Sequence, residues 1–321
     1  MDPQITTFAL VVAIIVALLV IVFMSGCIIY IPNNRIGVLE KLWSLRGSIR
    51  DGFIACSGEA GFQPDVLRGG FHFFLPFQYR VHPAPLVTIP QGQIGYVFAR
   101  DGIALAPTQT LASNTDANDY EDVRGFLTGA GQKGPQRKIL REGTYALNLA
   151  QFVVLTSERT YAISMAPSEM DLFREMSEVI AQRQGFQPVV IKDADDVIGI
   201  VTVHDGPALR EGEIIAPSVG NEAGGPNFHN NFQDPEAFLR AGGFRGRQHQ
   251  VLVDGSYYLN RLFATIELVD KTIIEVGTVG VVVSYTGERG VDLSGVEYRH
   301  GEAVEPGFRG VWNKPLLPGK Y

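Results

Sequence analysis

A short apolar phrase with a glycine at its centre occurs four times in this chain of 321 residues. The central glycines, which we call the opening glycines, are Gly37, Gly95, Gly199 and Gly280. In the last three copies another glycine follows seven residues later, at Gly102, Gly206 and Gly287, after Asp101, Asp205 and Thr286. Aspartate and glycine after a β-branched run are typical of a hairpin turn, because glycine tolerates positive φ. A small unit cannot bury its apolar face alone, so its repetition predicts a tandem array of β modules.

A second phrase follows downstream of each opening glycine. It contains a glycine, an aromatic residue two positions later and usually Leu-Asn, and its glycines are Gly143, Gly255 and Gly319, with a looser copy over residues 69–73. From this closing glycine to the next opening glycine there are 26 residues (Gly69 to Gly95) or 25 (Gly255 to Gly280), but 56 from Gly143 to Gly199. The longer interval predicts an inserted element.

The inserted element is predicted to be a helix over residues 168–185. Ser168 is a suitable N-cap, and Gly185 can end the helix. Its apolar residues fall on one helical face: Leu172, Phe173, Met176, Val179 and Ile180. A shorter helix is expected after Asp234, with Pro235 in its first turn and Gly242 at its end.

The rest of the chain alternates short β-branched and aromatic runs with glycine and proline, which is typical of β structure. Two polar stretches interrupt the pattern, over residues 108–136 and over the Gly/Asn-rich residues 216–248. Both are expected to be solvent loops. The first could instead bind a partner, since loops often carry function.

The N-terminus carries the strongest single signal of location. Residues 8–31 contain no charged side chain, and this length can cross a hydrocarbon core of roughly 30 Å as a helix. A cleaved signal peptide and a lipoprotein site at residues 24–27 are the competing interpretations. The absence of Lys or Arg before the apolar run argues against both.

Flanking charge predicts the orientation of this span. Only Asp2 precedes it, whereas Arg35, Lys41, Arg46 and Arg50 follow it closely. Positive charge stays on the cytoplasmic side, so we expect a plasma (inner) membrane protein whose body faces the cytoplasm. The two cysteines cannot form a disulfide framework, which agrees with that compartment.

These boundaries predict a mainly β fold: an N-terminal transmembrane helix followed by a tandem array of small β modules with one inserted α-helix. The anchor is residues 1–31, and the modules are 32–86, 87–192, 193–271 and 272–321. The last module ends before the Leu-Asn that follows two earlier closing glycines. We therefore expect it to be incomplete, with the natural chain continuing beyond Tyr321.

Motifs for catalysis, cofactors or metals are missing from the sequence. The net charge of −7 disfavours a nucleic-acid partner, since phosphate binding needs a basic face. The six histidines have no zinc spacing. An acidic cluster at residues 193–196 is interpreted as a solvated turn, and Glu297, His300 and Glu302 as loop residues. An anchored hydrolase built from His204, Asp205 and Glu213 is the remaining enzymatic alternative.

An aromatic run close to the anchor has two interpretations. It contains Phe71, Phe73, Phe74, Phe77 and Tyr79. The first interpretation is a strand buried in the first module. The second is a membrane contact, because aromatic rings are favoured in the headgroup region.

Several phrases resemble those of flotillin-like proteins of the SPFH/band 7 superfamily. They follow the N-terminal apolar segment and occupy residues 31–38, 89–95, 252–260 and 316–321. The β modules are also similar to the repeats of the major vault protein. The long Ala/Glu-rich coiled-coil region of flotillins is missing here.

The resemblance implies a membrane-anchored scaffold that forms a ring or cage and organises a membrane microdomain or the proteins in it. Its expected partners are the lipid bilayer, further copies of the chain and membrane-protein cargo, with no cofactor and no catalysis. A regulatory subunit that encloses a membrane protease or channel is the alternative.

Overall fold

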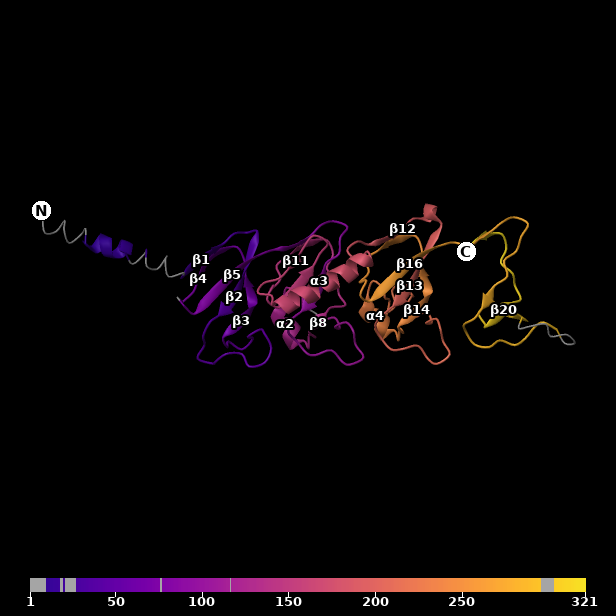
Figure 1. The fold of residues 1–321 in the computed structure, drawn as a ribbon, viewed down its shortest axis with the longest axis horizontal. Helices are drawn as coiled ribbons and strands as arrows, with labels where there is room; N and C mark the ends of the chain where they lie inside the picture. The colour runs from indigo at the N-terminus through magenta and orange to yellow at the C-terminus, as the bar shows by residue number, and fades with distance from the viewer. Residues whose placement is uncertain (1–9, 18–19, 21–26, 76, 116, 296–302) are drawn as a thin grey trace. The chain divides into compact units, whose positions relative to one another are not determined.

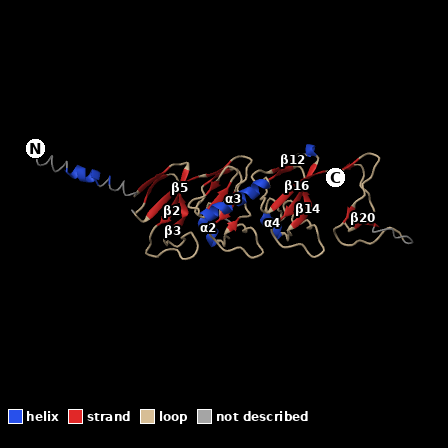
Figure 2. Ribbon diagram, viewed as in Figure 1, coloured by secondary structure: helices blue, strands red, loops and turns tan. Residues whose placement is uncertain are grey.

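The computed structural model describes residues 10–17, 20, 27–75, 77–115, 117–295 and 303–321. The chain is mainly β and is built from several small sheets (Figure 2). It divides into two compact units. Unit 1 comprises residues up to 106 together with 110–187, and unit 2 comprises 107–109 together with 188–321.

The first part of unit 1 contains a two-stranded ribbon and a three-stranded sheet. In the ribbon, β1 (Ile28–Ile31) pairs antiparallel with β4 (Gly70–Phe73). In the sheet, β2 (Arg35–Lys41) lies between β3 (Gly61–Leu67) and β5 (Tyr79–Pro85), as Figure 1 shows. We call this combination of ribbon and larger sheet a module, and this one module 1.

The second part of unit 1, module 2, has the same pairing. Strand β6 (Val87–Ile89) pairs with β9 (Gly143–Tyr145) in the ribbon. Strand β7 (Tyr96–Ala99) lies between β8 (Gly134–Pro135) and β10 (Phe152–Leu155), and β11 (Thr160–Tyr161) extends the sheet. Two helices of unit 1 belong here: α2 (Val123–Thr128) and α3 (Pro167–Gln182).

In unit 2 the pairing recurs as module 3. Strand β12 (Val189–Ile191) pairs with β15 (Gly255–Tyr257), and β13 (Val197–Val203) lies between β14 (Gly246–Leu252) and β16 (Ala264–Asp270). A 3-10 turn, η1 (Asp193–Asp195), precedes β13, and helix α4 (Pro235–Arg240) precedes β14.

Module 4 keeps the ribbon, but its larger sheet differs: the strand that follows the opening glycine lies at the edge, and one of the two pairings is parallel. Strand β17 (Ile273–Ile274) pairs with β21 (Gly319–Lys320). Strand β20 (Gly310–Trp312) lies between β18 (Val283–Ser284) and β19 (Ala303–Val304). In each module the closing phrase thus pairs with a strand that precedes the opening glycine.

The opening glycines make room for one isoleucine side chain in each module. A Cβ on Gly95 would lie 2.5 Å from Ile89 Cδ1, and one on Gly37 would lie 2.5 Å from Ile31 Cδ1. The equivalent pairs in unit 2 are Gly199 with Ile191 and Gly280 with Ile274. The glycines recur because the ribbon isoleucine packs directly over the backbone of the sheet.

The closing aromatic residues share a hydrogen bond to the carbonyl four residues earlier. Tyr145, Tyr257 and Tyr321 each donate from the hydroxyl, over 3.0, 2.9 and 3.0 Å. In module 1, His72 Nε2 lies 2.7 Å from Arg68 O and takes the same place. A rigid ring therefore ties the closing strand to the turn before it in all four modules.

A cluster of buried apolar side chains joins modules 1 and 2. It includes Ile36 and Ile54 from module 1 and Phe152 from module 2, together with Tyr120 and Phe126. The last two belong to residues 108–136, so the expectation of a solvent loop there is wrong. Their aromatic rings face Phe152 at centroid distances of 5.2 and 5.1 Å.

The stretch 216–248 is also part of the core of its module rather than a solvent loop. His229, Phe232 and Phe238 are buried and pack against one another. The polar composition of both stretches concealed that they contribute to the core. A few apolar side chains among many polar residues and glycines are enough to cover a small sheet.

The two predicted helices are present. Helix α3 spans Pro167–Gln182 instead of 168–185, with Ala166 rather than Ser168 as the N-cap, because Pro167 suits the first turn. Helix α4 follows Asp234, whose side chain accepts a hydrogen bond from Ala237 N. Helix α2 was not predicted, since its six residues are too few for a clear apolar period.

The predicted membrane span at residues 8–31 lies partly outside the described residues. Residues 10–17 and 20 are helical. Ile28–Ile31, which we expected within the span, instead form β1 because they pair with β4. Across the described residues, none of the helices combines the length and apolarity needed to cross a bilayer.

Candidate functional site

The polar residues that suggested chemistry have structural partners. Within the described part of the chain, no group of three or more His, Cys, Asp or Glu side chains could hold a metal ion. The acidic turn at residues 193–196 forms ion pairs: Asp193 with Lys271 at 3.6 Å and Asp196 with Lys320. Glu297, His300 and Glu302 lie outside the described residues.

Two residues of the hydrolase alternative make contacts within the fold. His204 Nε2 lies 3.0 Å from Thr265 Oγ1, so this contact connects the end of β13 to β16. Asp205 is buried and accepts a hydrogen bond from Gly206 N at 3.0 Å, which is a turn contact. Glu213 is exposed on a loop.

Cys56, in module 1, is a free cysteine that could serve as a nucleophile. Burial raises the pKa of its thiol, although the positive charge of Arg124 acts in the opposite direction. A thiol with a raised pKa holds little reactive thiolate at neutral pH.

The glycines predicted to define the repeats include several with positive φ, a backbone conformation that other residues rarely adopt. Gly102, Gly206 and Gly287 have φ of 136°, 105° and 95°, and the closing glycines Gly143 and Gly255 have φ of 155° and 153°. At Gly102 a side chain would also meet the backbone oxygen of Gly131. These glycines shape the modules.

The aromatic run of module 1 is largely exposed, so the interpretation as a buried strand is wrong. Phe71, Phe73 and Phe77 are 69%, 73% and 79% exposed. Phe74 and Tyr79 are half-buried and pack on each other, with ring centroids 5.3 Å apart. The burial of β4 alternates, because the other face of its ribbon covers the module.

Neighbouring strands extend this exposed surface. Tyr30, 59% exposed, lies opposite Phe71 in the β1–β4 ribbon with ring centroids 4.9 Å apart. Leu75 is 66% exposed. We call Tyr30, Phe71, Phe73, Leu75 and Phe77 the aromatic face. Exposed apolar patches of this kind mark a protein or membrane contact.

Modules 1 and 2 are joined by a carboxylate. Asp101 Oδ2 accepts hydrogen bonds from the backbone N–H groups of Phe53 and Ile54, at 2.5 and 3.0 Å. The guanidinium of Arg100 lies 4.4 Å from the centre of the Phe53 ring. This joint fixes a loop of module 1 on the turn of module 2.

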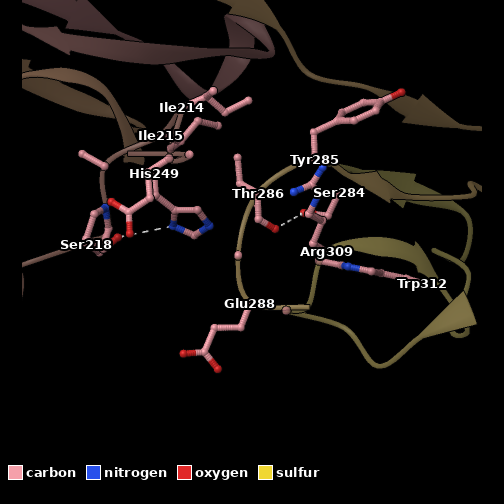
Figure 3. A pocket seen from close by; sticks show the side chains of 16 residues that line it. Ile214, Ile215, Ser218, His249, Ser284, Tyr285, Thr286, Glu288, Arg309 and Trp312 are labelled. Atoms are coloured by element: carbon pink, nitrogen blue, oxygen red, sulfur yellow. Dashed lines mark hydrogen bonds between the residues drawn. The ribbon is translucent and has the colours of Figure 1, made fainter. Parts of the chain in front are cut away.

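A cavity of about 690 Å³ lies in unit 2 between loops of modules 3 and 4. Ile214, Ile215 and His249 contribute from module 3, and Thr286 and Arg309 from module 4, as Figure 3 shows. Of the residues considered for the hydrolase alternative, only Glu213 lines this cavity. One sequence feature marks this cavity. The turn glycines Gly102 and Gly206 follow an aspartate, whereas Gly287 follows Thr286.

The chain matches no protein-family model, and no curated protein matches its sequence.

Proposed function

We propose that this protein is a membrane-anchored structural scaffold. It assembles with copies of itself into a ring or cage at the plasma membrane, with its body in the cytoplasm, and organises a membrane microdomain or the proteins within it. The resemblance to flotillin-like proteins and to vault repeats motivates this proposal. The aromatic face and the apolar N-terminal segment are its proposed lipid contacts.

The observation that carries the proposal is the open sheet edge of module 3 at β16. Strand β16 is an outer strand of its sheet, has seven residues and contains no proline. The other outer strand, β14, is partly covered, because Ala216 forms backbone hydrogen bonds with Arg247 and His249. In module 1 the outer strands carry Pro64, Pro83 and Pro85. Proline blocks edge pairing, whereas an unprotected edge is a template for another chain.

Native mass spectrometry of the detergent-extracted chain tests the proposal. We expect a large homo-oligomer whose population falls when Leu268→Lys places a charge on β16, because edge lysines oppose pairing. Val253→Lys is the matched control: Val253 is 54% exposed and Leu268 is 53% exposed, but Val253 lies outside the strands. A monomer at every concentration would contradict the scaffold.

The same detergent extract distinguishes the scaffold from the alternative, a regulatory subunit. A stoichiometric membrane protease or channel that copurifies, with no larger homo-oligomer, would favour a regulatory subunit. The contact of His204 with Thr265 and the turn contact of Asp205 give no support to a hydrolase.

A further inference from the structure

A repeated backbone contact shows which loop residues of modules 1 and 3 are equivalent. The N–H of Ala55 donates to Phe62 O at 2.7 Å, and the N–H of Ala216 donates to Arg247 O at 2.8 Å. Each acceptor is the middle residue of a Gly-x-Gln sequence at the start of the edge strand, residues 61–63 and 246–248. The Gln side chain of both sequences donates to the carbonyls two and four residues before it. Ala216 therefore corresponds to Ala55.

In module 1 the two residues before this alanine bind a carboxylate. They are Phe53 and Ile54, whose N–H groups both donate to Asp101 Oδ2. Asp101 precedes the turn glycine of the next module, Gly102. Two adjacent backbone N–H groups form a concave donor pair that suits an anion.

In module 3 the corresponding residues are Ile214 and Ile215. The next module has Thr286 before its turn glycine, so the carboxylate is missing from this joint. Among the described residues, none accepts a hydrogen bond from the N–H of Ile214 or Ile215. The same donor pair is thus present without the acceptor that satisfies it in module 1.

The cavity of about 690 Å³ lies at this position. Ile214, Ile215 and Thr286 all line it, and Arg309 supplies a positive charge in its wall. His249 Nδ1 lies 3.3 Å from Ser218 Oγ at its edge. Two acidic residues, Glu213 and Glu288, also line the cavity. The side chain of Glu288 extends away from His249 in Figure 3.

We propose that this cavity binds a carboxylate group through the N–H groups of Ile214 and Ile215, with Arg309 balancing its charge. The ligand is either a small free carboxylic acid or an acidic side chain of a polypeptide. In both cases the carboxylate takes the position that Asp101 takes in the first joint. The inference does not depend on the scaffold function.

Isothermal titration of the full chain in detergent with two probes tests the site. The first probe is succinate, and the second is a peptide with the sequence of residues 98–104, FARDGIA, which carries the Asp101 carboxylate. We expect at least one of them to bind. Binding of succinate identifies a small-acid site, whereas binding of the peptide alone identifies a site for an acidic segment. A chain that binds neither probe would overturn the proposal.

Thr286→Asp supplies the missing carboxylate in the chain itself. We expect it to weaken binding of the probe at least about tenfold, since each charge-assisted hydrogen bond that the ligand loses accounts for about that factor. It should also raise the melting temperature, because the donor pair becomes satisfied. Thr286→Asn has nearly the same shape without the charge and should leave affinity within about twofold.

A second variant changes the positive charge of the site. Arg309→Gln should weaken binding of the aspartate probe without changing the binding of the amide probe FARNGIA, which differs from it only in lacking the Asp carboxylate when both peptides have blocked termini. Unchanged affinity in both Thr286→Asp and Arg309→Gln would show that any binding occurs elsewhere, and would overturn the assignment.

Discussion

At the scale of single residues, the opening glycines are explained by contact. The φ of Gly95 is not positive, so its backbone would accept alanine. What excludes a side chain is Ile89, whose Cδ1 and Cγ1 would lie 2.5 and 3.3 Å from the new Cβ. The glycine and the isoleucine therefore form a pair that must change together.

We predict that Gly95→Ala destabilises the protein by about 1–3 kcal/mol, the usual effect of overpacking. Ile89→Val removes the Cδ1 atom that causes the clash and should partly rescue Gly95→Ala. The free energies of unfolding from urea denaturation of both single variants and the double variant give the coupling. Purely additive effects would contradict the contact.

His229 makes stability dependent on pH. Burial lowers the pKa of its imidazole, while the bond to Val219 O and the charge of Asp234 act in the opposite direction. Its Nδ1 accepts from Phe232 N at 2.8 Å and its Nε2 donates to Val219 O at 2.7 Å. A proton on Nδ1 would remove the acceptor for Phe232.

The unfolded chain therefore binds a proton on His229 at higher pH than the folded chain. We predict that the free energy of unfolding decreases as the pH falls below about 6.5, the ordinary pKa of histidine. His229→Gln should be less stable at pH 8 but should lose less on acidification. Denaturation curves with the same pH slope for both proteins would exclude His229 as the cause.

At the scale of elements, one arginine attaches helix α3 to module 2. The guanidinium of Arg100 donates to the carboxylate of Glu169 at 3.0 and 2.9 Å and to the carbonyls of Ala150 and Ile163. The side chain is 7% exposed. Burial pushes the pKa of Glu169 upward, but the hydrogen bonds from Ala166 N and Arg100 outweigh it and lower the pKa.

We predict that Arg100→Lys lowers the free energy of unfolding by about 1–3 kcal/mol, because lysine cannot replace the planar set of donors. Arg174→Lys, in the same helix, is the control: its side chain is 71% exposed and its pair with Asp171 should be worth less than about 1 kcal/mol. Thermal unfolding followed by circular dichroism measures both. Equal losses would show that Arg100 has no special role.

At the scale of the whole molecule, the aromatic face is an exposed set of mostly aromatic side chains that is close in sequence to the apolar N-terminal segment. The face covers the ribbon of module 1 only. The corresponding ribbon residue of module 2, Thr144, is not aromatic. This asymmetry among otherwise similar modules favours a contact particular to module 1, which we propose to be lipid.

We predict that a chain lacking residues 1–27 still sediments with liposomes, and that Phe73→Asp and Phe77→Asp together weaken this binding at least about tenfold. The fold should be unaffected, since both rings are more than 70% exposed. Val276→Asp, at a position 94% exposed in module 4, is the matched control and should bind like the parent chain. A shortened parent chain that does not bind liposomes would refute the lipid contact.

The sequence alone determined the β class, the positions of the turn glycines and the presence of helices α3 and α4. These features depend on neighbours along the chain: glycine where φ is positive, proline in a first helical turn, and an apolar period of sufficient length. Local chemistry is visible in local sequence.

Only the tertiary structure decided the rest. It paired Ile28–Ile31 with β4, placed Tyr120 and Phe126 in the core, exposed Phe73, and brought Asp101 to the N–H groups of Phe53 and Ile54. Each of these features depends on contacts between residues that are tens of positions apart in the sequence. Burial and hydrogen bonding act between neighbours in space, and the sequence does not specify those neighbours by its spacing.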